Sequence, residues 1–176
     1  EMVTDLLDLS RIEHGELKLH IEKINLQECI DQSIDSLKNL GKKKNVVIKC
    51  NCPNKTQYVF ADKKALERIL TNLIDNAFKY SEEDSVINIA TKTKHKDDNV
   101  LISITDSGKG ISDEDKPVIF DRFFRTAEAR ASEKKGSGLG LAIVKNLVNS
   151  LNGDVGVKNA PNNKGSQFWL TLPIAR

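Results

Sequence analysis

The stretch DKKALERILTNLIDNAFKY, residues 62–80, decides the fold class. Its apolar residues follow one another at alternating steps of three and one, which places them on one face of an α-helix. Asp62 stands just before the first turn, where a short acidic side chain is a favoured N-cap. We predict a helix from residue 62 to residue 80 with one face in the core. The core-facing residues are Leu66, Ile69, Leu70, Leu73, Ile74, Ala77 and Phe78.

Further helices are predicted on both sides of this one. Asn25 can cap a helix that runs to about residue 39 and ends in the stretch 41–45. Pro117 suits the first turn of a short helix over 117–124, and apolar spacing predicts another over 139–151. Residues 126–137 are small and charged with almost nothing to bury, so we predict a mobile loop there.

Strand-like runs alternate with these helices. The predicted strands are 46–52, 58–61, 86–92, 99–105, 154–159 and 166–172. The first two are expected to form a hairpin around Pro53 and Asn54, and the next two an antiparallel pair around 95–98. The pattern predicts an α/β (α+β) two-layer sandwich. Its sheet is expected to be mixed and largely antiparallel, covered on one face by about three helices.

Composition and charge exclude several classes of protein. The chain has 176 residues, which suits one domain with a short appendage. Hydrophobic residues make up 39% and charged residues 30%, so the chain can build a core and is no disordered polyelectrolyte. Because 27 Lys and Arg face 25 Asp and Glu, the net charge is only +2. We therefore expect no nucleic acid partner and no membrane contact by this fragment.

The cysteines and the start of the chain bear on its cellular setting. Three cysteines are an odd number in a chain of this length, so a reducing compartment fits better than a disulfide framework. Cys50 and Cys52 form a C-x-C without a second pair, which favours a strand edge over a zinc site. The chain begins with Glu1 rather than Met. We expect a piece of a longer protein, located in the cytoplasm whether or not its parent is anchored in a membrane.

The first residues form a pattern of their own. An amphipathic helix is predicted to run to about residue 13, and Gly15 follows as a stop. Such an apolar stripe needs a second helix to cover it, from another copy or from missing sequence. The residues of the stripe are Met2, Val3, Leu6, Leu7 and Leu9.

A polar ridge runs beside the core face of the 62–80 helix. Asn72, Asn76 and Lys79 fall at i, i+4 and i+7, so they share one face. Such a face can be merely solvated. It also offers amide oxygens that suit Mg²⁺ and an ammonium that can balance phosphate charge.

A second candidate site is DSGKG, residues 106–110, where a predicted strand enters a loop. As a turn, D-x-G-x-G is common and can be purely structural. A carboxylate fixed at a strand end can also accept a hydrogen bond from an exocyclic amine such as that of adenine. The glycines would let a flat ring approach the backbone.

Two further segments bear on phosphate binding. GSGLG, residues 136–140, precedes a predicted helix, so its free N–H groups and the helix dipole could meet phosphate oxygens. It matches neither the P-loop nor the dinucleotide fingerprint. FDRFFR, residues 120–125, can be interpreted in two ways. Its aromatic residues can be core contacts with solvated arginines beside them, or the segment can be part of a lid in which Arg125 reaches a terminal phosphate.

Together these motifs are similar to the N, G1, F and G2 boxes of sensor histidine kinases. The similarity covers about residues 26–176 and extends to GSQF at 165–168. DLLDLSRIE, residues 5–13, resembles the last turns of the second helix of the dimerisation and phosphotransfer domain in these kinases. The resemblance implies residues 1–24 as the end of that helix with a linker. It implies residues 25–176 as an ATP-binding catalytic domain with a flexible ATP lid.

The resemblance also implies ATP and Mg²⁺ as cofactors, with Asn76 as the metal ligand. Catalytic roles would fall to Asn72, Lys79 and Arg125, and Asp106 would bind the adenine amine. The implied cofactor-binding residues are Asn76, Lys79, Tyr80, Asp106, Gly108, Gly110, Ile111, Arg125, Gly136, Ser137, Gly138, Leu139, Gly140, Leu141 and Ser166.

Two features indicate phosphoryl transfer to an acceptor outside this chain. Gyrase, Hsp90 and MutL relatives carry a water-activating Glu at the position matching Asn72, and an amide cannot take that proton. The family's acceptor His precedes an acidic residue on an earlier helix, whereas His14, His20 and His95 stand elsewhere. We expect transfer to a histidine of the dimerisation domain of the same kinase, in cis or in trans, with a response regulator downstream.

Two alternatives to this function remain open at the level of sequence. One is a nucleotide-binding regulatory module without transfer activity. The other is a Ser/Thr kinase of the anti-sigma-factor type, which shares the ATP pocket.

Overall fold

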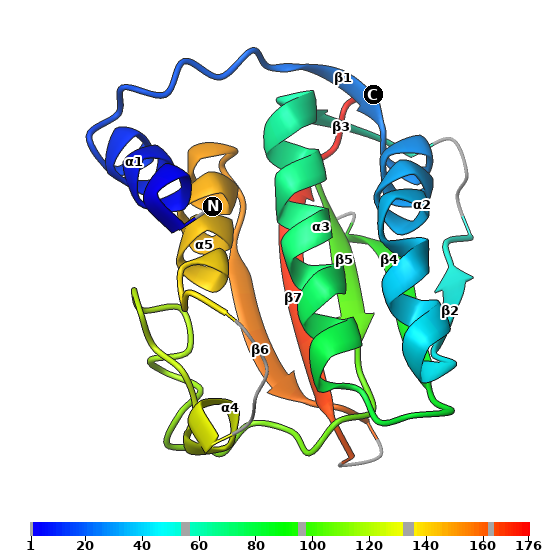
Figure 1. Cartoon of the computed structure of the whole chain (residues 1–176). Helices are drawn as coiled ribbons and strands as arrows, with labels where there is room; N and C mark the ends of the chain where they lie inside the picture. Colours follow the sequence, from blue (N-terminus) through cyan, green and yellow to red (C-terminus); the bar gives the residue numbers. More distant parts are fainter. Residues whose placement is uncertain (1, 54–56, 95–97, 132–135, 162–163) are drawn as a thin grey trace.

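The structure is a two-layer sandwich of one main sheet and a layer of helices (Figure 1). This computed structural model describes residues 2–53, 57–94, 98–131, 136–161 and 164–176. In that part of the chain, five strands form the main sheet in the order β2-β4-β5-β7-β6. Their bounds are β2 Val47–Asn51, β4 Val86–Lys94, β5 Asn99–Thr105, β6 Val155–Asn159 and β7 Ser166–Pro173. Only β2 and β4 pair in parallel, so the predicted mixed, largely antiparallel sheet is confirmed.

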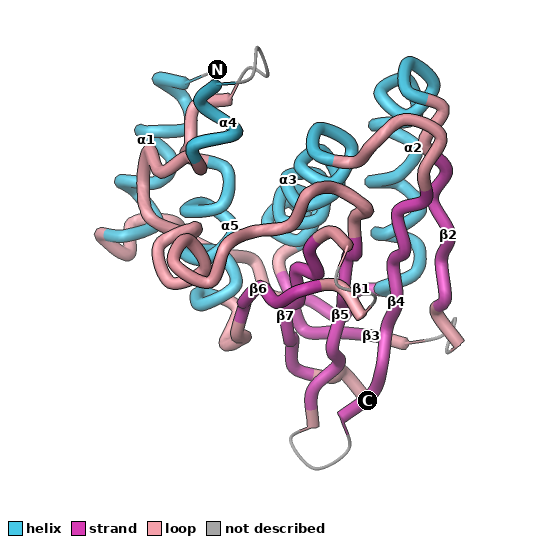
Figure 2. The backbone as a smooth tube through the Cα atoms, turned by 90° about the horizontal axis from the view of Figure 1, so that it is seen from below, coloured by secondary structure: helices cyan, strands magenta, loops and turns pink. Residues whose placement is uncertain are grey.

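Three helices cover one face of this sheet: α2 (Leu26–Lys44), α3 (Lys63–Tyr80) and α5 (Gly140–Ser150). Figure 2 shows them on one side of the strands, with α3 between α2 and α5. The Oδ1 atom of Asp62 accepts a hydrogen bond from the backbone N–H of Ala65 at 2.9 Å, as the N-cap prediction requires. All seven predicted core residues of α3 are buried.

Alternating side chains of the strands complete the core. On β5, every second residue is buried beneath the helices. Cross-strand pairs within the core include Ile89 with Ile104 on β4 and β5, and Ile102 with Leu170 on β5 and β7. A continuous apolar layer therefore lies between the sheet and α3.

The predicted hairpin between 46–52 and 58–61 is wrong. β2 instead pairs in parallel with β4, and β3 (Tyr58–Ala61) pairs with β1 (Glu22–Asn25) in a separate two-stranded sheet. The buried Val59 of β3 bridges to Ile174, which ties this small sheet to the end of β7. Neighbouring strands in sequence thus belong to different sheets. Of the supposed turn, Asn54 lies outside the described residues.

Strand β1 was not predicted at all, because its sequence EKIN contains a single apolar residue. Its pairing with β3 depends on a partner more than thirty residues away. Cys50 lies on β2 at one edge of the main sheet, and Cys52 lies just beyond that strand, in agreement with the strand-edge interpretation.

Helix α2 is longer than predicted and continues to Lys44. Gly41 does not end it, because this residue packs against α3: a Cβ there would lie 2.7 Å from Cε1 of Phe78. The helix ends at Asn45, which has a φ of 53° and donates its N–H back to Gly41 and Lys42. Asn45 is the residue that leaves the helix in the left-handed conformation.

The predicted helix over 117–124 is absent, and consecutive turns occupy this region. Phe123 has a φ of 61°, a left-handed conformation incompatible with a regular helix, and its N–H donates to the carbonyl of Gly138 at 2.9 Å. A short helix, α4 (Ala127–Ala131), stands where a loop was predicted, and Ala129 is buried. Residues 132–135 of the predicted mobile loop lie outside the described residues.

The N-terminal helix α1 (Met2–Glu13) packs against α5. Leu9 is completely buried and Ile12 nearly so, whereas the other four residues of the predicted stripe remain exposed. The expectation that a helix from another copy or from missing sequence covers this stripe is wrong for Leu9, because α5 of this chain packs against α1 and Leu9 lies in the core. The exposed residues of the stripe are Met2, Val3, Leu6 and Leu7.

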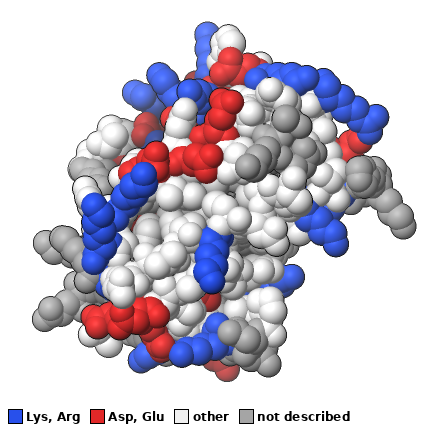
Figure 3. All heavy atoms as spheres, turned by 90° about the vertical axis from the view of Figure 1, so that its right-hand side faces the viewer, with Lys and Arg blue, Asp and Glu red and all other residues white. Residues whose placement is uncertain are grey.

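Ion pairs hold α1 in this position. Arg68 on α3 donates to Asp5 at 2.9 Å and to Asp8 at 2.7 Å, and Arg122 pairs with Glu13. All these side chains except Arg122 are less than one-third exposed, so solvent screens the pairs around Arg68 only in part. On the far side of the molecule, over α2 and β2, Lys and Arg are mixed with Asp and Glu (Figure 3), which matches the small net charge.

Arg68→Ala should loosen α1 without unfolding the domain. The change removes two charged hydrogen bonds, which together contribute on the order of 1 kcal/mol. Amide exchange of residues 2–13 should accelerate about fivefold, while exchange in the core of α3 stays unchanged. Lys63→Ala, which removes only the exposed 3.9 Å pair with Glu67, is the matched control. Unaltered exchange in α1 would show that Arg68 does not hold this helix.

Candidate functional site

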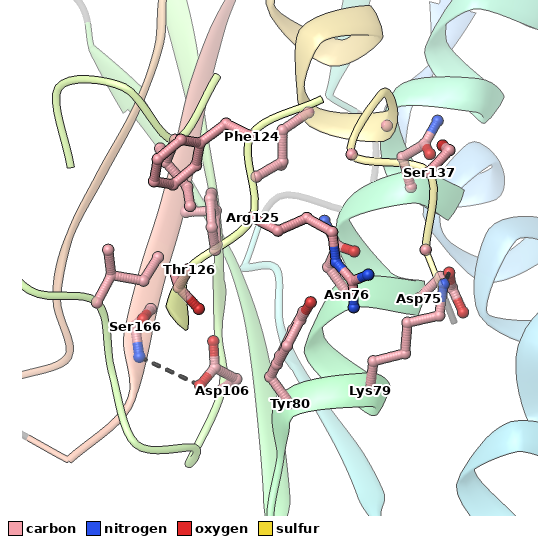
Figure 4. Close-up of a pocket in the computed structure, with 18 of the residues that line it drawn as sticks. Asp75, Asn76, Lys79, Tyr80, Asp106, Phe124, Arg125, Thr126, Ser137 and Ser166 are labelled. Atoms are coloured by element: carbon pink, nitrogen blue, oxygen red, sulfur yellow. Dashed lines mark hydrogen bonds and ion pairs between the residues drawn. The ribbon is translucent and has the colours of Figure 1, made fainter. Parts of the chain in front are cut away.

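A cavity of about 610 Å³ opens between α3, the ends of β5 and β7, and the segments before and after α4 (Figure 4). Fourteen of the sixteen residues predicted from sequence line it: Asn72, Asn76, Lys79, Tyr80, Asp106, Gly110, Ile111, Arg125, Gly136, Ser137, Gly138, Gly140, Leu141 and Ser166. The other lining residues were not predicted as catalytic or cofactor-binding residues: Met2, Asp5, Asp75, Ile119, Phe124, Thr126 and Phe168.

The polar ridge of α3 forms one wall of this cavity. Asn72 donates to the carbonyl of Arg68 at 2.9 Å, and its Oδ1 lies 2.8 Å from where a Cβ on Gly140 would be. Asn72 is thus packed against the first turn of α5. One turn on, the half-buried Asn76 makes no side-chain hydrogen bond to any described residue, so its amide is available to a ligand. Lys79 forms an ion pair with Asp75 at 2.5 Å.

Asp106 forms part of the opposite wall, where β5 ends beside the start of β7. Its Oδ1 accepts from the backbone N–H groups of Gly108 at 2.9 Å and Ser166 at 3.2 Å. The side chain is buried, and burial raises the pKa of this carboxyl, partly offset by the two backbone donors. Its Oδ2 accepts no hydrogen bond from the described residues. Asp106 therefore offers a fixed acceptor to a donor group in the cavity.

Gly108 is required by the close approach of two segments. A Cβ on this residue would lie 2.4 Å from the carbonyl oxygen of Tyr80, a distance that no side chain can adopt. Gly108 does not line the cavity itself. Its role in the structure is to let the turn after Asp106 lie directly against the end of α3.

The glycine segment before α5 is closely packed on the aromatic segment. Gly138 has a φ of 72°, and a Cβ there would lie 2.8 Å from the backbone of Phe123. Leu139, predicted as a cofactor contact, is instead fully buried and lies outside the cavity, so it anchors the start of α5 in the core. Arg125 enters from the other side, and its Nη2 donates to the carbonyl of Ala129 on α4 at 2.5 Å.

The donor set of the cavity fits Mg²⁺ held jointly with phosphate. Mg²⁺ keeps several waters and takes only one or two protein oxygens when phosphates supply the rest. Asn76 offers such an oxygen. Within the described part of the chain, no group of three His, Cys, Asp or Glu side chains could hold a metal by itself.

The histidines stand apart from this site. His14 follows the last turn of α1, and the backbone N–H of His20 donates to Asp62 at 2.9 Å in the connection to β1. Neither lines the cavity, and His95 lies outside the described residues. A second, more open hollow of about 340 Å³ lies between Glu13, Arg122 and Lys145.

Comparison with known proteins agrees with this geometry. Residues 61–176 match the model of the histidine kinase-, DNA gyrase B- and HSP90-like ATPases. The chain belongs to this family. Within the family, its relatives include SenX3 of Mycobacterium tuberculosis, 33% identical over 173 residues, which are 98% of this chain and 41% of SenX3. WalK of Bacillus subtilis is 33% identical over 172 residues, 98% of this chain and 28% of WalK.

A solved structure has the same fold over almost the whole chain. ShkA, solved at full length in complex with AMPPNP, superposes with a TM-score of 0.86 at 26% identity, covering 99% of this chain and 35% of ShkA. SenX3 is a sensor-like histidine kinase and WalK a sensor histidine kinase, which confirms the resemblance to this group. The chain carries a histidine kinase ATPase domain. It spans less than half the length of SenX3 or WalK.

Asp106→Asn should stabilise the ATPase domain at neutral pH. The pKa of Asp106 is higher in the folded chain than in the unfolded chain. The resulting contribution to folding stability is therefore fully present below the unfolded pKa and is lost as the pH rises through the folded pKa. The amide keeps an Oδ1 acceptor for Gly108 and Ser166 without a buried charge. Urea unfolding should give equal free energies in acid, with the variant gaining as pH rises to 7. A variant that loses stability relative to wild type as the pH rises would contradict the raised pKa of Asp106.

Proposed function

We propose that this domain binds Mg-ATP in the cavity and transfers the terminal phosphoryl group to a histidine of a dimerisation and phosphotransfer domain, as part of two-component signal transduction. One observation carries the proposal. Four segments far apart in sequence, around residues 72–80, 106–111, 125 and 136–141, meet in one cavity. In the described part of the chain, neither the Asn76 amide on one wall nor the Oδ2 atom of Asp106 on the other has a hydrogen-bond partner.

The adenine end of the site is assigned to Asp106. Its Oδ2 would accept the exocyclic amine, while Gly110, Ile111 and Ser166 shape the surrounding wall. Tyr80 would pack near the base from α3. A ring entering here meets a buried carboxylate that the backbone already orients, so little reorganisation opposes binding.

The phosphate end is assigned to Asn76, Lys79, Arg125 and the glycine segment 136–140. Asn76 would be the Mg²⁺ ligand, and the ion would supply charge neutralisation for the phosphates. Lys79 would share its ammonium between Asp75 and a phosphate oxygen. Arg125 would lie near the terminal phosphate, where its planar fork suits paired oxygens. Gly136, Gly138 and Gly140, with Ser137 and Leu141, would close over the phosphates as the lid.

Catalysis would come from positioning and charge stabilisation. An imidazole nitrogen of the acceptor attacks the terminal phosphorus in line, the bond to the bridging oxygen breaks, and ADP leaves with that electron pair. Asn72 cannot act as a general base towards water, since an amide is not basic at neutral pH. We infer that water competes poorly and that the phosphoryl group is kept for histidine.

Residues 1–24 are proposed to be the end of the phosphotransfer helix with its linker, and residues 25–176 the catalytic domain. The acceptor domain would belong to the same kinase, in cis or in trans, and a response regulator would take the phosphoryl group onward. We place this domain in the cytoplasm, where ATP is available. Among the described residues, no helix is both long and apolar enough to cross a bilayer.

Asn76→Asp should abolish binding of Mg-ATP. A carboxylate at this position would repel the phosphates, where the wild-type amide offers a neutral oxygen. We expect the affinity to fall by at least about tenfold, which corresponds to about 1.4 kcal/mol of binding free energy. Titration calorimetry measures the effect. Asn39→Asp, an equal change on the exposed surface of α2, is the control and should bind normally. Wild-type affinity in Asn76→Asp would reject the site.

Transfer can be tested in trans with a separately purified two-helix phosphotransfer hairpin from a relative. We expect radiolabel from [γ-³²P]ATP to appear on the hairpin as an acid-labile, base-stable phosphohistidine. Binding of ATP without any transfer would instead indicate a regulatory module, and an acid-stable product on a protein substrate would indicate a Ser/Thr kinase.

A further inference from the structure

Lys44, the last residue of α2, closes the far end of α3. Its Nζ donates three hydrogen bonds, to the carbonyls of Phe78 at 3.0 Å, Lys79 at 2.9 Å and Ser81 at 3.1 Å. The three donors of one ammonium are therefore all directed at a single turn of backbone. Lys44 itself does not line the cavity.

This end of α3 lacks the usual backbone closure. A helix leaves its last four carbonyls without partners, and many helices satisfy them through a glycine in the left-handed conformation. Here the cap residue is Ser81, with an extended conformation of φ −62° and ψ 147°, and its N–H satisfies only the carbonyl of Ala77. A cation at the negative end of the helix dipole takes the place of the missing motif.

The turn that Lys44 holds is the one that meets the Asp106 loop. The carbonyl of Tyr80 lies so close to Gly108 that a Cβ there would approach it to 2.4 Å. Lys79 and Tyr80, whose side chains line the cavity, lie between Phe78 and Ser81, whose carbonyls Lys44 binds together with that of Lys79. A shift of this turn would move both side chains and the loop that orients Asp106.

The same part of α2 is fixed from the other side. The backbone carbonyl of Lys44 accepts from the N–H of Asp84 at 3.0 Å, and Asn45 donates to the carboxylate of Asp84 at 2.6 Å. Lys44 therefore links two segments: its backbone carbonyl binds Asp84, and its side chain binds the last turn of α3.

We propose that Lys44 is a positioning residue for the nucleotide site: its ammonium holds the last turn of α3 so that Lys79 and Tyr80 stay on the wall opposite Asp106. The inference rests on the proposed function, since it concerns the same cavity. Lys44 acts through the backbone of α3 and touches no nucleotide.

The test is binding of Mg-ADP by Lys44→Ala, measured by calorimetry at a temperature where every variant is folded. We expect the affinity to fall by about tenfold, because the turn loses the charged hydrogen bonds that hold it in the binding conformation. Lys44→Arg, whose fork can still donate to these carbonyls, should restore most of the affinity. If Lys44→Ala does not fold, Lys44→Gln, which keeps two donors without the charge, should show a smaller loss.

Asn25→Ala is the matched control for stability. This change removes the N-cap of α2, in which Asn25 accepts from Gln27 at 3.0 Å, and destabilises the same helix without touching α3. It should leave Mg-ADP affinity unchanged, and only Lys44→Ala should speed amide exchange at residues 78–81. Binding within twofold of wild type in Lys44→Ala, or an equal loss in Asn25→Ala, would overturn the proposal. If wild type itself fails to bind Mg-ADP, the proposed function fails instead.

Discussion

The 3.6-residue period of α3 is the constraint on which the rest of the structure depends. Seven apolar side chains on one face are buried in the core that α3 shares with the main sheet, and this fixes the rotation of the helix about its axis. Once that rotation is fixed, Asn72, Asn76 and Lys79 necessarily project beside the core, towards the space between α3 and the strand ends. The hydrophobic face thus determines where the polar ridge of the cavity lies.

The opposite wall depends on backbone packing in place of side-chain periodicity. Asp106 is held by N–H groups from its own turn and from the start of β7, and the turn can approach α3 only because residue 108 is glycine. Gly138 plays a similar part beneath the glycine segment, where its left-handed backbone lies against Phe123. Gly108 therefore lets the two walls meet through their backbones, and Gly138 does the same for the glycine segment and the segment around Phe123. A side chain at either glycine would separate the two segments that meet there.

Local patterns in the sequence predicted the parts of the fold that local physics determines. The caps at Asn25 and Asp62, the core face of α3 and the β4–β5 pair all follow from short-range periodicity. The pairing of β2 and β3 did not, because each strand finds its partner far along the chain. Met2 and Asp5 were not predicted as cavity residues for a related reason, because they come from a helix docked through Arg68. Asp75 was not predicted either, although it lies on α3 directly before Asn76.

The central claim is that this one cavity takes the nucleotide with its adenine at Asp106 and its phosphates at Asn76. The most direct measurement is an NMR titration of the ¹⁵N-labelled domain with Mg-AMPPNP. We predict that the backbone amides of Gly108 and Ser166 and the side-chain amide of Asn76 shift together and saturate at one ligand per chain. Saturable shifts confined to the hollow around Glu13, Arg122 and Lys145, or no saturable shifts at these three groups, would contradict the account.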